Sequence, residues 1–252
     1  MTHVTQSRSP ATKQMFKQIL SSALYAGLIA GLISALLQFW LVTPLLLEGE
    51  EYETGAKSHY AGVLIVDGED VTASEEEEEV EAPPTTSEKL ARHGMTVAMN
   101  VLVFTGFGLI LAAAFGTAQM AGLEVNARTG LIWGLVGFVV IQLAPAAGLY
   151  PELPGTPADD VTLRQMWWIT TVIATAVGIG MITFGANLWW GIAGAAFIAL
   201  PHVIGAPHLD FYAGVAPPEL AALFVSRILA VACATWVVLG GVAGYAWHKH
   251  AV

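Results

Sequence analysis

Long apolar segments with few charged residues recur along this chain and restrict it to one class of fold. A helix needs about 20 apolar residues to cross the hydrocarbon core of a bilayer. Over the whole chain 55% of the residues are hydrophobic and 12% are charged, against about 25% charged in a soluble domain. The sequence therefore predicts an all-α polytopic membrane protein with about six transmembrane helices. The six segments are 18–42, 95–119, 129–149, 165–184, 187–203 and 219–247.

The charges between these segments predict how the chain is oriented. Basic residues near span ends prefer the cytoplasmic side, and Arg8, Lys13 and Lys17 precede the first segment. Six crossings would place both termini in the cytoplasm, although the short fifth segment leaves its own crossing open. The expected plan is a cytoplasmic segment at 1–17, a first transmembrane helix at 18–42, an acidic external loop at 43–94, a five-helix membrane bundle at 95–247 and a cytoplasmic tail at 248–252.

Several function classes lack their usual signatures. The net charge of −10 argues against nucleic-acid binding, which needs basic patches. A single cysteine, Cys233, excludes a disulfide within the chain and a thiolate metal cluster. There is no Walker A sequence, HExxH motif or nucleophile elbow. We therefore expect neither an enzyme nor a permanently bound cofactor.

Carboxylate and imidazole side chains gather where two of the segments end. The loop after the first segment begins LEGEEYE, and the fifth segment ends in LPHVIGAPHLD at 200–210. Carboxylate oxygen and imidazole nitrogen are ligands for divalent transition metals such as cobalt and nickel. Both segments run outward, so we expect their ends to converge on a metal site at the outer mouth of the bundle. Its candidate ligands are His202, His208, Asp210, Glu48, Glu51, Glu53 and His59.

These features also have plain structural interpretations. A run of like charges such as Glu75–Glu79 usually stays solvated and disordered, or it raises the local cation concentration and captures ions. His202 is equally suited to a hydrogen bond with a backbone carbonyl left free by Pro201. Both interpretations stay open at this point.

Polar residues inside the predicted spans are costly in lipid and therefore suggest a function. Gln38 and Gln142 either line a path or form hydrogen bonds between helices, and hydrogen bonding is the favoured interpretation. Arg227 lies about two turns into the sixth segment, where either the helix projects from the membrane or an outward acid such as Glu152 or Asp210 is its partner.

Small residues at four-residue spacing predict where helices pack closely. Such spacing lets two helix backbones approach each other in a membrane. It is weak evidence for a homo-oligomer, because most such pairs pack a bundle internally. The small residues concerned are Ala23, Gly27, Gly31 and Ala35 in the first segment, Gly130 and Gly134 in the third, and Gly240 and Gly244 in the sixth.

Three stretches of the chain resemble the CbtA family of predicted cobalt transporter subunits. They are LYAGLIAGLISALLQFWLVTPLLLEGEEYE, GLIWGLVGFVVIQLAPAAGLYPELPGTPADD followed by RQMWW, and ALPHVIGAPHLD with PPELAALFVSRIL. The likeness covers roughly residues 15–245, and its most specific part is LAPAAGLYPELPG. Where relatives often carry a histidine-rich acidic tract in the first outer loop, this chain has almost only glutamate, flanked by His59 and His93.

The resemblance implies a bacterial inner-membrane subunit that acts with a small single-span, histidine-containing partner, CbtB. It carries Glu48, Glu51 and Glu53 and the PHVIGAPH histidines over as candidate metal contacts. The expected function is thus a membrane subunit of a divalent transition-metal uptake system, with cobalt, or else nickel, as the transported ion. The alternative is a structural or assembly subunit of a larger membrane complex that does not itself transport.

Overall fold

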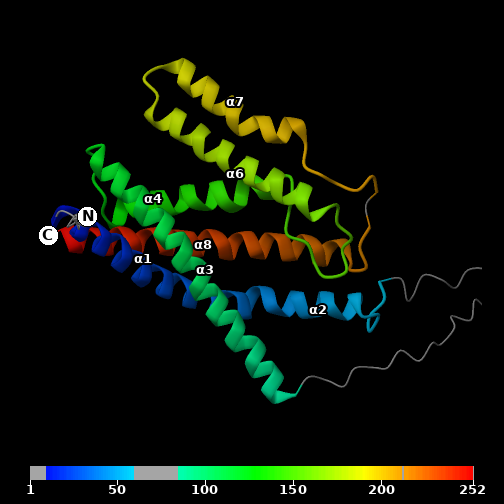
Figure 1. Cartoon of the computed structure of the whole chain (residues 1–252). Coiled ribbons are helices and arrows are strands. Elements are labelled where there is room, and N and C mark those ends of the chain that lie inside the picture. The colour runs from blue at the N-terminus through cyan, green and yellow to red at the C-terminus, as the bar shows by residue number, and fades with distance from the viewer. Residues whose placement is uncertain (1–9, 60–84, 212, 252) are drawn as a thin grey trace, which may run out of the picture.

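The structure is a computed structural model that describes residues 10–59, 85–211 and 213–251. Regular structure within these residues is entirely helical (Figure 1), which confirms the predicted all-α membrane fold. The elements are α1 (Pro10–Leu37), a π-helical turn η1 (Gln38–Val42), α2 (Thr43–Glu53), α3 (Thr86–Met120), α4 (Ala127–Phe138), a second π-helical turn η2 (Val139–Leu143), the short α5 (Ala144–Ala146), α6 (Val161–Phe184), α7 (Leu188–Ile204) and α8 (Pro218–Ala251).

Five helical stretches are long and apolar enough to cross a bilayer, and α7 is a shorter apolar helix of 17 residues. The start of α1 and the end of α8 lie close together in Figure 1, and Gln18 of α1 donates a hydrogen bond to the carbonyl of Trp247 in α8. We call this end of the bundle the terminal end, and the opposite end, where α2 finishes, the acidic end. α6 descends to the terminal end, and α7 returns the chain to the acidic end, from which α8 starts.

The first helix is longer than its predicted span. α1, η1 and α2 form one apolar helical stretch, Gln14–Glu53, of 40 residues. Pro44 does not break it, because the π-helical turn η1 directly before α2 widens the helix where the proline N–H is missing. At the other side of the acidic loop, α3 starts at Thr86 with a capping box between Thr85 and Glu88.

Helix therefore continues into both flanks of the expected 43–94 loop. The part of that loop at 60–84, which includes the glutamate run at 75–79, lies outside the described residues.

The two π-helical turns occur at matching places in the sequence. Each precedes a proline, in QFWLVTP and VVIQLAP. The N–H of Thr43 bonds to the carbonyl of Gln38 and the N–H of Ala144 to that of Val139, so each turn is one residue wider than an α-helical turn. Proline removes one ladder bond, and the wider turn lets the helix continue past it. Such turns often occur at functional sites.

Glycines bring helix backbones together in the terminal half of the bundle. A Cβ added to Gly134 would collide with the carbonyl oxygen of Trp236, and one on Gly240 with the carbonyl oxygen of Gly130. α1 approaches α3 in the same way, because a Cβ on Gly27 or Gly31 would meet the α3 backbone. The predicted close packing of small residues is thereby confirmed as internal packing of one chain.

The α6–α7 hairpin lies to one side of the other helices (Figure 1). Gly178 and Gly194 form its internal contact, since a Cβ on either would reach the carbonyl oxygen of the other at 2.5 Å. Among the described helices α7 packs against α6, while α6 also meets α5 and η2. The convergence expected at the outer ends of the first and fifth spans would require these helices to be neighbours, but in the described residues α7 contacts neither α1, η1 nor α2 and packs on α6 instead.

Candidate functional site

Three of the four carboxylates at the end of the first helix pair with cations from the protein itself. The Nζ of Lys57 lies 2.6 Å from a carboxylate oxygen of Glu51 and 3.6 Å from one of Glu48. The hydrogen bond to Glu51 raises the pKa of Lys57 above its ordinary value. All three side chains are about half exposed, at 42–51%. A metal ion that binds Glu48 and Glu51 must therefore displace Lys57.

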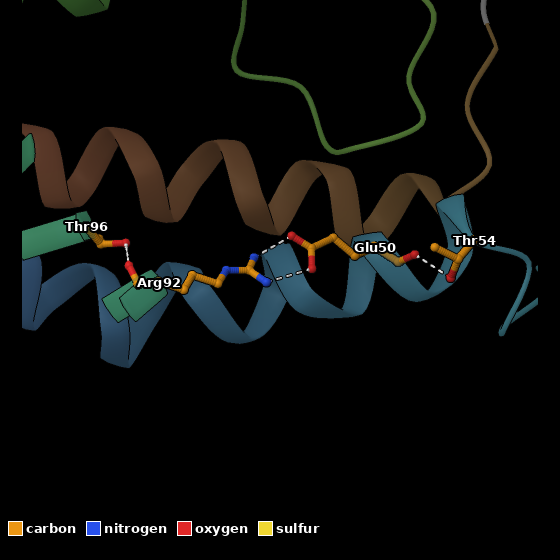
Figure 2. A network of polar contacts seen from close by, with 4 residues as sticks. All are labelled: Glu50, Thr54, Arg92 and Thr96. Carbon is orange, nitrogen blue, oxygen red and sulfur yellow. Dashed lines mark hydrogen bonds and ion pairs between the residues drawn. The ribbon is translucent and has the colours of Figure 1, made fainter. Parts of the chain in front are cut away.

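Glu50, between these two glutamates, joins α2 to α3. Both nitrogens of the Arg92 guanidinium donate to its carboxylate, at 2.5 and 3.2 Å (Figure 2). The hydroxyl of Thr54 donates to the carbonyl of Glu50, and that of Thr96 to the carbonyl of Arg92. The two-point geometry orients the two side chains toward each other as well as neutralising charge.

The predicted ligands on the fifth segment lie in different surroundings. His202 is half-buried in the last turn of α7, and its ring meets the edge of the Trp167 ring with centroids 5.7 Å apart. Trp167 in turn donates from Nε1 to the carbonyl of Pro201 at 3.1 Å. His208 and Asp210 are exposed in the segment after α7. His202 thus contributes to the packing of α7 on α6.

The expected convergence of these ligands is not seen. In the described parts of the chain, no three His, Cys, Asp or Glu side chains come together so that they could hold a metal ion. α2 packs on α8, and Gly49 of α2 is contacted by Leu153 from the segment between α5 and α6. Glu53 is next to Gly155 of the same segment, and His59 is exposed just beyond α2.

A cavity of about 400 Å³ opens inside the acidic half of the bundle. It lies between the first helix, α3, η2 and α8, and we call it the chamber. Its walls combine apolar side chains with one hydroxyl and three carboxamides. The lining residues are Ser34, Gln38, Val42, Leu46, Met99, Asn100, Val103, Phe104, Phe107, Gln142, Phe224, Ile228, Val231 and Ala232.

The polar side chains of the chamber are only partly satisfied by one another. Gln38 and Asn100 exchange hydrogen bonds at 3.1 and 3.2 Å, and Gln38 also donates to Ser34 at 3.4 Å. The Oε1 atom of Gln142 is buried and has no hydrogen-bond partner within the described protein. The prediction that the glutamines form bonds between helices is confirmed for Gln38. Gln142 instead presents an unused acceptor.

The expected acidic partner of Arg227 is wrong. Its Nη1 atom donates to the backbone carbonyl of Leu41, within the π-helical turn η1, at 3.0 Å. Glu152 is paired with Arg164 at 2.7 and 3.2 Å. Arg227 lies opposite η1 rather than at the helix end, so the nearest acceptor is a main-chain oxygen. It thereby attaches α8 to the first helix beside the chamber.

Two features of this region were not predicted from the sequence. Asn100 carries the same signal as Gln38, a carboxamide inside an apolar span, and reading that signal again would have found it. The pairing of Glu50 with Arg92 depends on how α2 and α3 cross, and no spacing in the sequence encodes that crossing.

The comparisons with known proteins support one family. A sequence profile described as "Probable cobalt transporter subunit (CbtA)" matches residues 16–248. No curated protein and no solved structure matches the chain. The match covers nearly the whole chain, including both π-helical turns and the acidic end of α2. The chain therefore belongs to the CbtA family of probable cobalt transporter subunits.

Proposed function

We propose that this chain is the membrane-embedded subunit of a divalent transition-metal uptake system, and that cobalt is its metal. The observation that carries the proposal is the family match over residues 16–248. The multi-pass helical bundle, with carboxylates gathered at one end, is compatible with it. We place the protein in the bacterial inner membrane, with both termini in the cytoplasm and the acidic end outside.

A subunit acts with a partner, and we propose a small single-span protein that supplies histidine ligands. The candidate ligands of this chain support a site whose ligands are divided between the two proteins. Glu48 and Glu51 are already paired with Lys57, and His202 packs on Trp167. His208 and Asp210 are exposed at the same end. Imidazoles from a partner would complete a ligand set that the described residues leave incomplete.

Uptake of radiolabelled cobalt tests the proposal directly. Cells that express the chain with its partner should accumulate cobalt faster than cells that lack either one. Replacing Glu48 and Glu51 together by Gln should reduce the initial rate at least fivefold. The matched control is Glu124→Gln, which changes an exposed glutamate at the terminal end.

Equal uptake with and without the chain would overturn the transport proposal. If the partner transports only when this chain is present, but no acidic-end variant changes the rate, the chain is an assembly subunit instead.

A further inference from the structure

The chamber is aligned with the acidic end along two helices. Residues four apart lie on one face of a helix. On the first helix this series is Ser34, Gln38, Val42 and Leu46, all of which line the chamber, and its next member is Glu50. On α3 the series runs Phe104, Asn100, Thr96 and Arg92, of which the first two line the chamber. The Glu50–Arg92 ion pair, drawn in Figure 2, therefore lies beyond the acidic end of the chamber, about one helical turn past Leu46 and two past Asn100.

The chamber extends from the acidic end toward the middle of the bundle. Ser34 and Leu46 both line it and are 12 residues apart, a rise of about 18 Å along a helix. At about 30 Å³ for each water molecule, a volume of about 400 Å³ holds a dozen waters. An ion with six waters needs less than half of that space.

The walls of the chamber contain buried polar atoms that lack a hydrogen-bond partner and that water could satisfy. They carry no charged side chain that could act as a ligand. Buried polar atoms almost always have a hydrogen-bond partner, yet Gln142 Oε1 has none in the described protein. The Nε1 atom of Trp236 is unpaired as well, and its ring packs on Phe104 and Phe107 of the wall. All four polar lining side chains, Ser34, Gln38, Asn100 and Gln142, are neutral.

Neutral carboxamides suit a hydrated ion better than a bare one. A dehydrated dication would need carboxylate or imidazole ligands to offset its lost hydration, and the wall provides neither. Carboxamide oxygens can accept hydrogen bonds from the water shell of a cation. Binding of this kind stays weak enough for the ion to leave again, which conduction requires.

We propose that the chamber is water-filled and holds a divalent cation with its water shell intact, admitted at the Glu50–Arg92 ion pair. This inference rests on the proposed function, because it describes how the transported ion occupies the membrane interior. It adds that the chamber does not select cobalt by direct ligation, so other hydrated dications of similar size occupy it as well.

Thiol labelling tests whether the chamber contains water, independently of transport. In a Cys233→Ala background, Ser34→Cys places a thiol in the chamber, and Ser22→Cys is its matched control. Both serines are fully buried on α1, but only Ser34 lines the chamber. Val231→Cys and Thr235→Cys form a second such pair, one turn apart on α8. The full chain in lipid nanodiscs is treated with a small cationic methanethiosulfonate.

We expect Ser34→Cys and Val231→Cys to react at least 30-fold faster than their controls. Equally slow reaction at all four positions would show a dry chamber and overturn the inference. Each variant must elute as the parent protein does in size-exclusion chromatography. The two pairs lie on different helices, so one misfolded variant does not decide the result.

Hexaamminecobalt(III) then tests whether the cation keeps its first shell of ligands. Its ammine ligands do not exchange, so it can bind the chamber walls only through hydrogen bonds from those ligands. It and Mg²⁺ should each slow labelling of Ser34→Cys at least fivefold. The exposed Ser58→Cys, which reports screening at the acidic end, should change less than twofold. Protection by Co²⁺ alone, or by none of these ions, would overturn the proposal.

Cobalt uptake measured on the same variants separates this inference from the proposed function. Labelling and protection without any uptake would leave the chamber inference intact and reject transport. Cobalt uptake by a protein whose chamber positions do not label would support transport and reject the chamber inference.

Discussion

The two halves of the bundle differ in what separates their helices. In the terminal half, backbone meets backbone at Gly130, Gly134 and Gly240, and the large side chains Phe115 and Trp247 fill the remaining core almost without exposure. In the acidic half, side chains keep the helices apart, and they line an open cavity of about 400 Å³. One half is close-packed and the other is hollow.

A gradient of residue size along the first helix accounts for this difference. Its inward face begins with residues that are fully buried and small, Ala23, Ala26 and Ala30, and continues with Ser34 and then Gln38. Small residues allow α1 to approach α3 closely, whereas a carboxamide and bulkier residues push the helices apart. α3 accordingly packs on α1, but α2 and α3 make no close backbone approach in the described residues. The close-packed terminal half thus holds the helices that line the chamber in the acidic half.

Filling a glycine in the terminal half should have the largest effect. Gly134→Leu would force a side chain against the Trp236 carbonyl, and we expect a loss of about 3 kcal/mol or more of unfolding free energy, at the upper end for overpacking. Unfolding in mixed detergent micelles measures it. The control is Gly106→Leu, because a Cβ there meets nothing within 4 Å. Equal losses would show that the terminal half is not close-packed.

Removing the arginine beside the chamber should have the next largest effect. Arg227→Met removes the hydrogen bond to the Leu41 carbonyl, and we expect a loss of about 1.5–3 kcal/mol, the range for bonds to charged groups. Arg128→Met, at an exposed position of the terminal end, is the control and should change stability little. Equal midpoints of chemical unfolding for the two variants would mean that the hydrogen bond from Arg227 to η1 does not stabilise the fold.

Replacing Gln142 distinguishes a chamber that contains water from one that does not. If water pairs Gln142 Oε1, Gln142→Leu should leave stability within about 0.5 kcal/mol while it slows cobalt uptake, since one bond is exchanged for burial. In a dry chamber the same variant should gain about 1–3 kcal/mol, the cost of the unsatisfied acceptor. Chemical unfolding and uptake on one preparation decide between these outcomes.

The ion pair at the acidic end should contribute least to stability. Glu50 and Arg92 are 35% and 48% exposed, and pairs of this kind contribute about 0.2–1 kcal/mol. A double-mutant cycle of Glu50→Gln and Arg92→Met should therefore give a coupling below about 1 kcal/mol that falls with added salt. A coupling energy above about 2 kcal/mol would show that the ion pair holds α2 and α3 together and does not open readily.

The periodic features of the fold could be predicted from the sequence. Apolar length placed the helices, and four-residue glycine spacing placed the close contacts, because both depend on local pattern. The π-helical turns were not predicted, although each precedes a proline in the same context. The first span is predicted to end at Val42, shortly before Pro44, but a widened turn can absorb a proline without ending the helix.

The candidate site depended more on how helices pair than on their composition. The ligands His202 and Glu48 were identified by residue type, and their convergence required the first and fifth spans to be neighbours. α7 instead packs on α6 through Gly178 and Gly194. Glycine spacing shows that a helix has a close-packing face, but it does not specify which other glycine face will meet it.

The length of the first helix affects which negative charges an ion meets first. Its 40 residues extend for about 60 Å, whereas the hydrocarbon core is about 30 Å thick and the bilayer with headgroups about 40–45 Å. Glu48, Glu50 and Glu51 occupy its last two turns, and the surplus length of the helix is enough to carry them past the lipid phosphates. The field of those phosphates decays over about 8 Å at physiological ionic strength. Carboxylates carried that far would meet a cation from solution before the membrane surface competes for it.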